Sequence, residues 1–327
     1  MRYVVYGAGA VGGGVGGLLH RAGLPVTLVA RGEHLATMRR DGLALQVGHT
    51  SYVVRPALAG SAAEVDWDGE PPVVLLCVKS QQTHTALADL APYLHRARAV
   101  VSLQNGVANE RTLLRHHPHV HGVTVMMPAS HLAPGQVVLH SANRPALLDV
   151  GRYPAGTDQV DDQVAADLRA AGFESVPRAD VMAWKHRKLV LNLGNAVDAL
   201  CPDEGADGEA ADELVRRARA EGEEVLAAAG VPVVSQEDDL ARRGQLLRPL
   251  VDRGPGHVGS STWQSVSRGT GDAEADFLNG EVVLQARLAG REVPVNALLQ
   301  AELAALVREG RPPRSVSARG LLERLDG

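Results

Sequence analysis

Residues 3–17 read YVVYGAGAVGGGVGG, an apolar run that leads directly into a cluster of glycines. The run predicts a buried β-strand, and the segment after it, to about Arg21, has the pattern of a helix. Gly7, Gly9 and Gly12 supply the spacing G-x-G-x-x-G at the junction. Such glycines permit a tight turn and let a pyrophosphate approach the free amides of the helix N-terminus. A purely structural turn is the alternative, but we predict a dinucleotide site formed by Gly7, Ala8, Gly9, Ala10, Val11 and Gly12.

Further glycines follow in the same predicted helix, at Gly13, Gly14, Gly16 and Gly17. Each should weaken an isolated helix by about 1 kcal/mol relative to alanine. Close packing of this helix against a cofactor or a sheet would explain why they are there.

Strand-like and helical segments alternate through the first half of the chain. The segments 25–31, 71–79 and 97–104 read as further strands, each followed by a helical pattern, and 43–56 reads as a hairpin around Gly48. This rhythm predicts a parallel α/β sheet, with an antiparallel-looking part after Val123.

After about Arg178 the strand signal stops and helical patterns follow, at 180–199, 207–229, 235–251, 272–289 and 295–308. The fold class is therefore α/β with an all-helical second part. We expect a dinucleotide-binding domain of the Rossmann type over residues 1–178 and a helical domain over residues 179–327.

The composition of the 327-residue chain excludes some classes of function. Its 33 basic and 38 acidic side chains give a net charge of −5, which argues against a general nucleic-acid binder. No stretch approaches the ~20 apolar residues of a membrane span, and the N-terminus lacks the pattern of a secretion signal. We expect a cytoplasmic protein without disulfides, and apolar helices in the second half are compatible with a homodimer.

The end of the second predicted strand indicates which dinucleotide binds. NAD sites usually carry Asp or Glu there, to bond the ribose 2′-hydroxyl. In this chain the strand ends at Arg31. A guanidinium suits a 2′-phosphate, so the sequence predicts NADPH, with a solvated loop arginine as the alternative.

Residues 184–195 read WKHRKLVLNLGN and hold two of the three lysines in the chain, the third being Lys79. All other basic residues among the 33 are arginines. Since lysine can release a proton near neutral pH and arginine cannot, we considered a proton-transfer role for this segment.

A helical projection of this segment places Lys188, Asn192 and Asn195 on one face. His186 and Arg187 fall on the opposite side, as a solvated face would, and Lys185 lies at the margin. A surface lysine in an ion pair is the usual alternative for Lys188. On this projection, replacing Lys185 should have only a mild effect on turnover.

The stretch HHPHVH at 116–121 offers four histidines, but no cysteine or acidic residue is adjacent in the sequence. Because structural and catalytic zinc sites combine such ligands, we expect no metal site here.

The chain resembles the ketopantoate reductase (2-dehydropantoate 2-reductase) family over nearly its whole length. The matching segments are GAGAVGG, CVKSQQT, LQNGV, WKHRKLVLNLGN and SSTWQS…EADFLNGEVVLQARLAG…PVN, in that order. The resemblance implies that the Rossmann domain over residues 1–178 binds NADP and that residues 179–327 form a helical substrate and catalytic domain. It also implies NADPH-dependent reduction of a 2-oxo acid, ketopantoate to pantoate, in pantothenate biosynthesis.

Site residues are carried over from the family position by position. Lys188 corresponds to the catalytic lysine, which acts as general acid, and Glu274 to the active-site glutamate. Taken alone, Glu274 would be a first-turn helix carboxylate. The resemblance assigns the remaining positions to substrate (Asn105, Asn192, Asn195, Ser261) and to cofactor (Lys79, Asn105).

The sequence also departs from the family pattern. Asn195 is offset by one position, the spacing from Ser261 to Glu274 is one residue longer, and Asp203 replaces an asparagine. A carboxylate at 203 would repel an anionic 2-oxo acid unless it points away. A relative that reduces another carbonyl or an imine therefore stays open, as does a non-enzymatic NADP(H)-sensing protein, although a sensor needs no proton donor.

Overall fold

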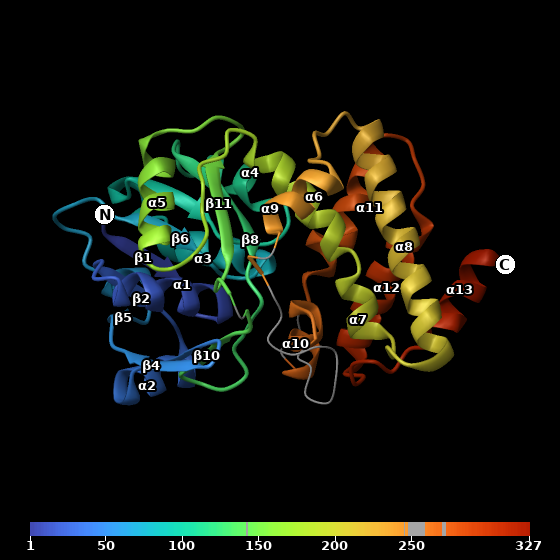
Figure 1. Ribbon diagram of the computed structural model, residues 1–327, viewed down its shortest axis with the longest axis horizontal. Helices are drawn as coiled ribbons and strands as arrows, with labels where there is room; N and C mark the ends of the chain where they lie inside the picture. The colour runs from blue at the N-terminus through green and yellow to red at the C-terminus, as the bar shows by residue number, and fades with distance from the viewer. Residues whose placement is uncertain (142, 245, 248–258, 270–272) are drawn as a thin grey trace. The chain divides into compact units, whose positions relative to one another are not determined.

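The computed structural model describes residues 1–141, 143–244, 246–247, 259–269 and 273–327 (Figure 1). The chain divides into two compact units. The first comprises Met1–Lys185 and Gln236–Gly254, and the second comprises His186–Ser235 and Pro255–Gly327. Residues 179–185 and the segment from Gln236 thus group with the first unit, whereas the sequence placed them in the second domain.

The first unit is built on a seven-stranded sheet of order β11-β8-β7-β6-β1-β2-β5. Neighbouring strands are parallel except for β11, which runs antiparallel to β8. This confirms the predicted α/β class and the antiparallel part after Val123. The strands are β1 (Tyr3–Tyr6), β2 (Val26–Val29), β5 (Ala57–Ala59), β6 (Val73–Leu76), β7 (Ala99–Ser102), β8 (Val120–Met126) and β11 (Leu147–Arg152).

Helices cover both faces of this sheet, and the side chains of β1 show how. Tyr3 and Val5 belong to an apolar cluster with α1 and α5, whereas Val4 and Tyr6 belong to a second cluster with α3 and α4. Because side chains alternate along a strand, one short apolar run supplies both layers. The helices are α1 (Ala10–Arg21), α2 (Gly32–Asp41), α3 (Thr83–Leu90), α4 (Asn109–Leu114), α5 (Gln159–Ala170) and α9 (Gln236–Arg243).

Helix α9 is joined to this unit by an ion pair. Arg242 donates two hydrogen bonds, of 2.8 and 2.9 Å, to the carboxylate of Asp149, which is fully buried on β11. The predicted helix over 235–251 ends at Arg243, and part of that range lies outside the described residues.

A smaller sheet of order β4-β3-β10-β9 also belongs to the first unit. Its strands are β3 (Leu43–Val47), β4 (Thr50–Val54), β9 (Ala129–Ser130) and β10 (Gln136–Leu139). The antiparallel β3–β4 pair confirms the hairpin predicted over 43–56, although its second strand ends at Val54.

Helix α1 lies between the two sheets, and its glycines make this possible. A Cβ at Gly16 would overlap Leu28 of the large sheet, and one at Gly14 would overlap Met127 and contact Leu139 of the small sheet. Of the two explanations that the sequence allowed, packing against a sheet is therefore the one that the structure supports for these glycines.

The second unit is helical, which confirms the predicted second part of the fold (Figure 1). Two expected helices differ in detail. The segment 180–199 is broken at residues 193–194 into α6 and α7, and 272–289 begins as a 3-10 helix, Glu274–Phe277, before α11. The helices are α6 (Val181–Asn192, whose first residues belong to the first unit), α7 (Asn195–Leu200), α8 (Gly205–Ala228), α10 (Ser261–Ser267), α11 (Asn279–Leu288), α12 (Pro294–Glu309) and α13 (Ala318–Asp326).

Among the described residues, none of the helices has both the length and the apolar character that a membrane crossing requires.

Candidate functional site

The glycine loop joins β1 to α1 in a conformation that larger residues could not adopt. Gly7 has φ +105°, and a Cβ there would lie 2.8 Å from Val78 Cγ1 and 2.9 Å from the Val78 nitrogen. A Cβ at Gly12 would overlap the carbonyl oxygen of Gly7. By contrast, a Cβ at Gly9 would meet no atom within 4 Å, so open space lies beside the loop. The glycines are therefore required by backbone packing, and the loop has room on one side.

The N-terminus of α1 suits an anion. Its first turn carries no acidic side chain and no side chain caps its amides. The amides of Ala10, Val11 and Gly12 point outward without intrahelical acceptors, as in any first helical turn. Free amides and the helix dipole together favour a pyrophosphate at this end. The residues predicted to contact a dinucleotide thus have the chemistry that such a group needs.

A histidine supports the loop from α2. His34 Nε2 lies 2.8 Å from the carbonyl oxygen of Ala8, and its Nδ1 accepts a hydrogen bond of 2.8 Å from the Gly135 amide. Since Nδ1 accepts, the neutral ring carries its proton on Nε2 and donates to Ala8. Burial lowers the pKa of His34 below its ordinary value. This ring links the loop to the start of β10.

Arg31 follows β2 and is held by two residues of the first unit. Its Nη2 donates a hydrogen bond of 2.9 Å to the hydroxyl of Tyr6, which itself donates one of 2.5 Å to Asp89. The distance from Arg31 Nη2 to the Asp89 carboxylate is 3.8 Å, and 59% of the arginine side chain remains exposed. Burial and the bond to Asp89 raise the pKa of Tyr6. The sequence did not single out Tyr6 or Asp89, although a tyrosine directly before the glycine loop was visible.

Lys79 and Asn105 follow the ends of β6 and β7, and both are half-buried. Hydrogen bonds join these two turns. The side chain of Gln104 donates to the carbonyl of Val78 over 2.8 Å, and Asn109 donates to Ser80 Oγ over 3.0 Å. The carboxyl ends of β1, β2, β6 and β7, which are neighbours in the sheet, therefore present the predicted cofactor residues of this unit at one edge.

The remaining predicted residues belong to the second unit. Lys188 is half-buried on α6, and Asn192 is buried at the end of the same helix. Asn195 and Ser261 are the first residues of α7 and α10, and both are half-buried. Glu274 opens the 3-10 helix Glu274–Phe277 and is only 5% exposed.

Three segments of this unit meet around the end of α6. Ser260 Oγ donates to the carbonyl of Asn195 over 3.4 Å, which joins the starts of α7 and α10. Asn279 Nδ2 donates to the carbonyl of Leu193 over 3.1 Å, which joins the start of α11 to the α6–α7 break. The structure thus gathers the segments that carry Asn192, Asn195 and Ser261, together with the helix that follows Glu274.

Two residues of the lysine-containing segment differ from their predicted places. Lys185, expected at the margin, is 3% exposed, forms an ion pair of 2.9 Å with the fully buried Glu110, and donates to the carbonyls of Gln104 and Val123. Arg187, expected on a solvated face, is 8% exposed and is bonded to Glu223 and the carbonyl of Val234. The projection assumed one buried face, whereas this helix is covered on more than one side. The rarity of lysine in the chain was a signal for Lys185 as well as for Lys188.

The carboxylate of Asp203 is paired within the second unit. Arg314 Nη2 lies 3.2 Å from Asp203 and 3.0 Å from Asp198. One guanidinium therefore neutralises part of the charge of two carboxylates, and Asp203 does not stand as an isolated negative charge.

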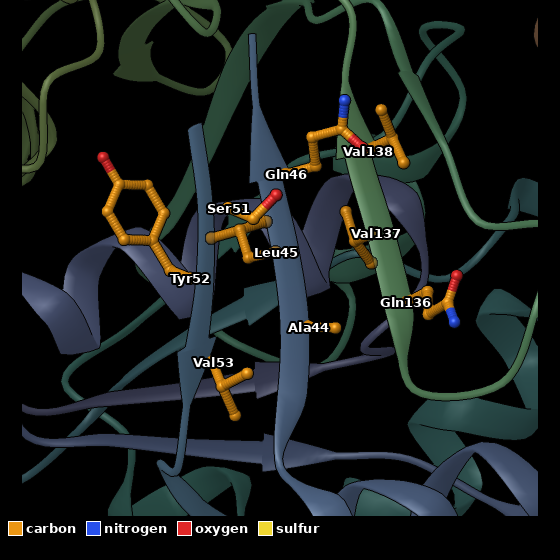
Figure 2. Close-up of a pocket in the computed structure, with 9 residues that line it drawn as sticks. All are labelled: Ala44, Leu45, Gln46, Ser51, Tyr52, Val53, Gln136, Val137 and Val138. Atoms are coloured by element: carbon orange, nitrogen blue, oxygen red, sulfur yellow. The ribbon is translucent and has the colours of Figure 1, made fainter. Parts of the chain in front are cut away.

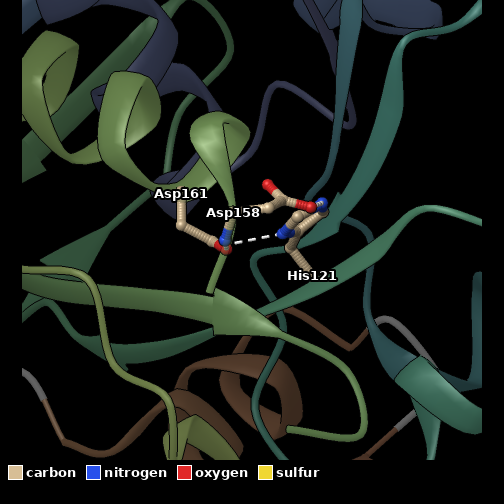
Figure 3. Close-up of side chains that lie close together, drawn as sticks. All are labelled: His121, Asp158 and Asp161. Carbon is tan, nitrogen blue, oxygen red and sulfur yellow. Dashed lines mark hydrogen bonds and ion pairs between the residues drawn. The ribbon is translucent and has the colours of Figure 1, made fainter. Parts of the chain in front are cut away.

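His121 is the histidine of the 116–121 stretch that lies near acidic side chains. Its Nδ1 is 2.7 Å from Asp161 and its Nε2 is 3.9 Å from Asp158, and one ligand atom from each residue lies within 4.8 Å of the others (Figure 3). Asp158 and Asp161 also cap the N-terminus of α5. Tetrahedral ligands about 2.1 Å from zinc lie roughly 3.4 Å apart, so the 2.7 Å separation fits a hydrogen bond better. We interpret the cluster as a structural contact that holds β8 to the N-terminus of α5.

A shallow groove of about 310 Å³ lies on the small sheet (Figure 2). Tyr52 is the one titratable side chain in its lining, and none of the predicted site residues contributes to it. The groove therefore has little capacity for acid–base chemistry. Its lining residues are Ala44, Leu45, Gln46, Ser51, Tyr52, Val53, Gln136, Val137 and Val138.

Comparisons with known proteins agree along the chain. Residues 3–154 match the family model described as Ketopantoate reductase PanE/ApbA, and residues 180–307 match its C-terminal model. The chain is 33% identical over 303 residues to a 2-dehydropantoate 2-reductase of Halobacterium salinarum, covering 90% of this chain and 95% of that protein.

Two solved structures are similar to this chain over nearly its whole length. A PanE/ApbA family ketopantoate reductase from Ralstonia eutropha JMP134 is 28% identical and has a TM-score of 0.79, covering 95% of this chain and 100% of the other. A D-mandelate dehydrogenase in complex with NADH and anilino(oxo)acetate has a TM-score of 0.81, with the same two coverages. At 19% identity, the latter is similar in fold alone.

Proposed function

Because the chain belongs to the ketopantoate reductase family of oxidoreductases, we propose that it reduces a small 2-oxo acid to the 2-hydroxy acid with NADPH. Ketopantoate, which would become pantoate, is the proposed substrate. The observation that carries the proposal is the glycine loop, where Gly7 and Gly12 have no room for a Cβ and the next residues open a helix without acidic side chains. A pyrophosphate is the group that such a loop favours.

Arg31 supports NADPH over NADH. It stands where NAD sites usually carry a carboxylate, and more than half of its side chain is exposed. A guanidinium can bind a 2′-phosphate through two parallel hydrogen bonds, which a ribose hydroxyl cannot accept equally well. Lys79 and Asn105, at the neighbouring strand ends, are assigned to the cofactor as well.

The bound nicotinamide would supply a hydride to the carbonyl carbon of the substrate, so that negative charge develops on the carbonyl oxygen. Lys188 donates a hydrogen bond to that oxygen and then releases the proton that completes the hydroxyl group. Arginine could stabilise the charge but would hold its proton. Glu274 is assigned to the same proton-transfer step.

Substrate binding is assigned to a set of polar side chains. Asn192 follows Lys188 by four residues on α6, which places both on one side of the helix. Ser261 is assigned to the substrate carboxylate, with Asn105 and Asn195 as further hydrogen-bond donors. The expected cytoplasmic location and homodimer stay predictions.

The ion pair with Arg314 weakens the argument for a different substrate. The sequence suggested that the carboxylate of Asp203 repels an anionic 2-oxo acid and left a different carbonyl compound or an imine open as the substrate. Because Asp203 already lies 3.2 Å from Arg314, it has a cationic partner within its own unit. We therefore propose the anionic 2-oxo acid in preference to an imine.

The test is to mix the purified protein with NADPH and a series of 2-oxo acids, other carbonyl compounds and imines, and to follow the loss of NADPH absorbance. Ketopantoate should give the highest kcat/KM. A higher value for another carbonyl compound or an imine would refute the substrate assignment but not the hydride chemistry. Cofactor binding without oxidation by any compound would instead support an NADP(H)-sensing protein.

A further inference from the structure

A series of hydrogen bonds within the first unit fixes the position of the Arg31 guanidinium. Tyr6 is the last residue of β1, immediately before the glycine loop, and its side chain is 3% exposed. Its hydroxyl accepts a hydrogen bond from Arg31 Nη2 and donates one to Asp89 Oδ2 on α3. The same Asp89 oxygen accepts a hydrogen bond of 2.9 Å from the amide of Ala62. Each member is thus anchored by the next, down to the backbone.

This chain of bonds affects how Arg31 can bind an anion. An unrestrained arginine loses about 2 kcal/mol of side-chain entropy when it is held in one geometry. The bond to Tyr6 already restrains the guanidinium, and it occupies only one of five N–H donors. The remaining donors are available for a phosphate that approaches from the exposed side.

The negative charge of Asp89 makes phosphate binding depend on the positive charge of Arg31. Its carboxylate lies 3.8 Å from Arg31 Nη2, and a phosphate bound on Arg31 would carry charge of the same sign. The guanidinium separates the two anions, so binding is favourable only while Arg31 is present. Without Arg31, the carboxylate of Asp89 and the hydroxyl of Tyr6 would resemble the acceptors that bond a ribose 2′-hydroxyl in NAD sites.

We propose that Tyr6 and Asp89 are positioning residues that make Arg31 selective for the 2′-phosphate, and that they determine the preference for NADPH over NADH. This inference rests on the proposed use of NADPH. It adds that selectivity depends on two residues that need not touch the cofactor.

The test is to measure the dissociation constants of NADPH and NADH by titration calorimetry for the wild type and for Tyr6→Phe, Asp89→Asn and Arg31→Ala. Tyr6→Phe keeps the ring and removes the hydroxyl, so NADPH affinity should fall about tenfold, a typical effect of losing a hydrogen bond to a charged group. NADH affinity should stay within about twofold, because NADH lacks the 2′-phosphate that Arg31 binds, and a hydrogen bond between Arg31 and its neutral ribose hydroxyl contributes little. Asp89→Asn should shift the ratio in the same direction but by less, since it weakens the anchor of Tyr6 while it also removes a negative charge near the phosphate.

A double variant tests the effect of the Asp89 charge on cofactor preference. Arg31→Ala should reverse the preference toward NADH, and Arg31→Ala combined with Asp89→Asn should lose that gain in NADH affinity. Tyr52→Phe is the matched control, because it removes a tyrosine hydroxyl on the small sheet, and its NADPH:NADH ratio should equal that of the wild type.

The outcomes separate this inference from the proposed function. Equal losses for both cofactors in Tyr6→Phe would mean a structural role only and would overturn the inference. If Arg31→Ala changes the ratio and neither Tyr6→Phe nor Asp89→Asn does, the inference is wrong and the NADPH assignment stands. If the wild type prefers NADPH and Arg31→Ala leaves the ratio unchanged, Arg31 does not select the cofactor and the inference is wrong, whereas equal affinities in the wild type would refute the NADPH assignment itself.

Discussion

Replacing Lys185 by methionine should destabilise the first unit strongly. The ammonium lies 2.9 Å from Glu110 and donates hydrogen bonds of 2.7 and 3.2 Å to the carbonyls of Gln104 and Val123. The side chains of Lys185 and Glu110 are 3% and 0% exposed, so Lys185→Met would leave a buried carboxylate without its counter-ion. Breaking a buried pair from one side costs about 3–5 kcal/mol.

This cost is a large share of the total stability, which is about 5–15 kcal/mol for a typical domain. For a unit of this size, it corresponds to a fall in Tm of roughly 6–20 °C. Urea unfolding and calorimetry should both report it. Helical projection placed Lys185 at the margin and predicted only a mild effect of its replacement on turnover, so it did not foresee this loss of stability.

A double-mutant cycle separates the ion pair from packing. Lys185→Met combined with Glu110→Gln should lose less stability than the sum of the single variants, because neither charge is then left alone. Arg96→Met is the control, since it removes an exposed pair with Asp68 and should cost about 0–1 kcal/mol. Additive effects of the two buried substitutions, or a Lys185→Met variant as stable as the control, would refute the reasoning.

Four further predictions concern the proposed chemistry and the glycine loop. Lys188→Ala should lower kcat by about 10²–10⁴-fold while NADPH affinity is kept, and Lys188→Arg should restore substrate binding more than turnover; single-turnover kinetics with ketopantoate would check both. Ser261→Ala should raise KM for the 2-oxo acid with a smaller change in kcat, and a large loss of kcat at unchanged KM would contradict its role. Arg31→Asp should weaken NADPH binding and narrow or reverse the cofactor preference, which equal binding of both cofactors by the wild type would already contradict. Because burial lowers the pKa of His34, the unfolded chain takes up its proton at higher pH than the folded one. The contribution of His34 to the free energy of unfolding should therefore be fully present above about pH 6.5 and be lost as the pH drops below it. Urea unfolding across this range should show a free energy of unfolding that depends less on pH for His34→Gln than for the wild type.

Local features of the fold could be predicted because contiguous residues determine them. The strand, the glycine spacing and the helix of residues 3–21 are one continuous signal, and Gly7 is needed where the structure has φ +105°. The hairpin over 43–54 is equally local. In such segments, periodicity and turn residues agree with the final packing.

The partners of buried charges could not be predicted, because they are distant in the sequence. Lys185 bonds the carbonyl of Gln104 across 81 residues, and His121 bonds Asp161 across 40. Asp203 meets Arg314 across 111 residues, and this contact changes how its charge should be interpreted. A projection of one helix shows which residues share a face but not how many faces are covered.

The glycines of α1 have a consequence for the order in which the protein folds. A helix with Gly12, Gly13, Gly14, Gly16 and Gly17 is weaker than its alanine equivalent by roughly 5 kcal/mol, so it does not persist on its own. It gains stability only when both sheets surround it, and β10, which contacts it, lies at residues 136–139.

During synthesis, the ribosome has therefore to make these residues before α1 can be held in place. Helix α1 thus precedes β10 in the sequence but acquires a stable conformation only after β10 has been made, and the glycine loop at its start forms with it.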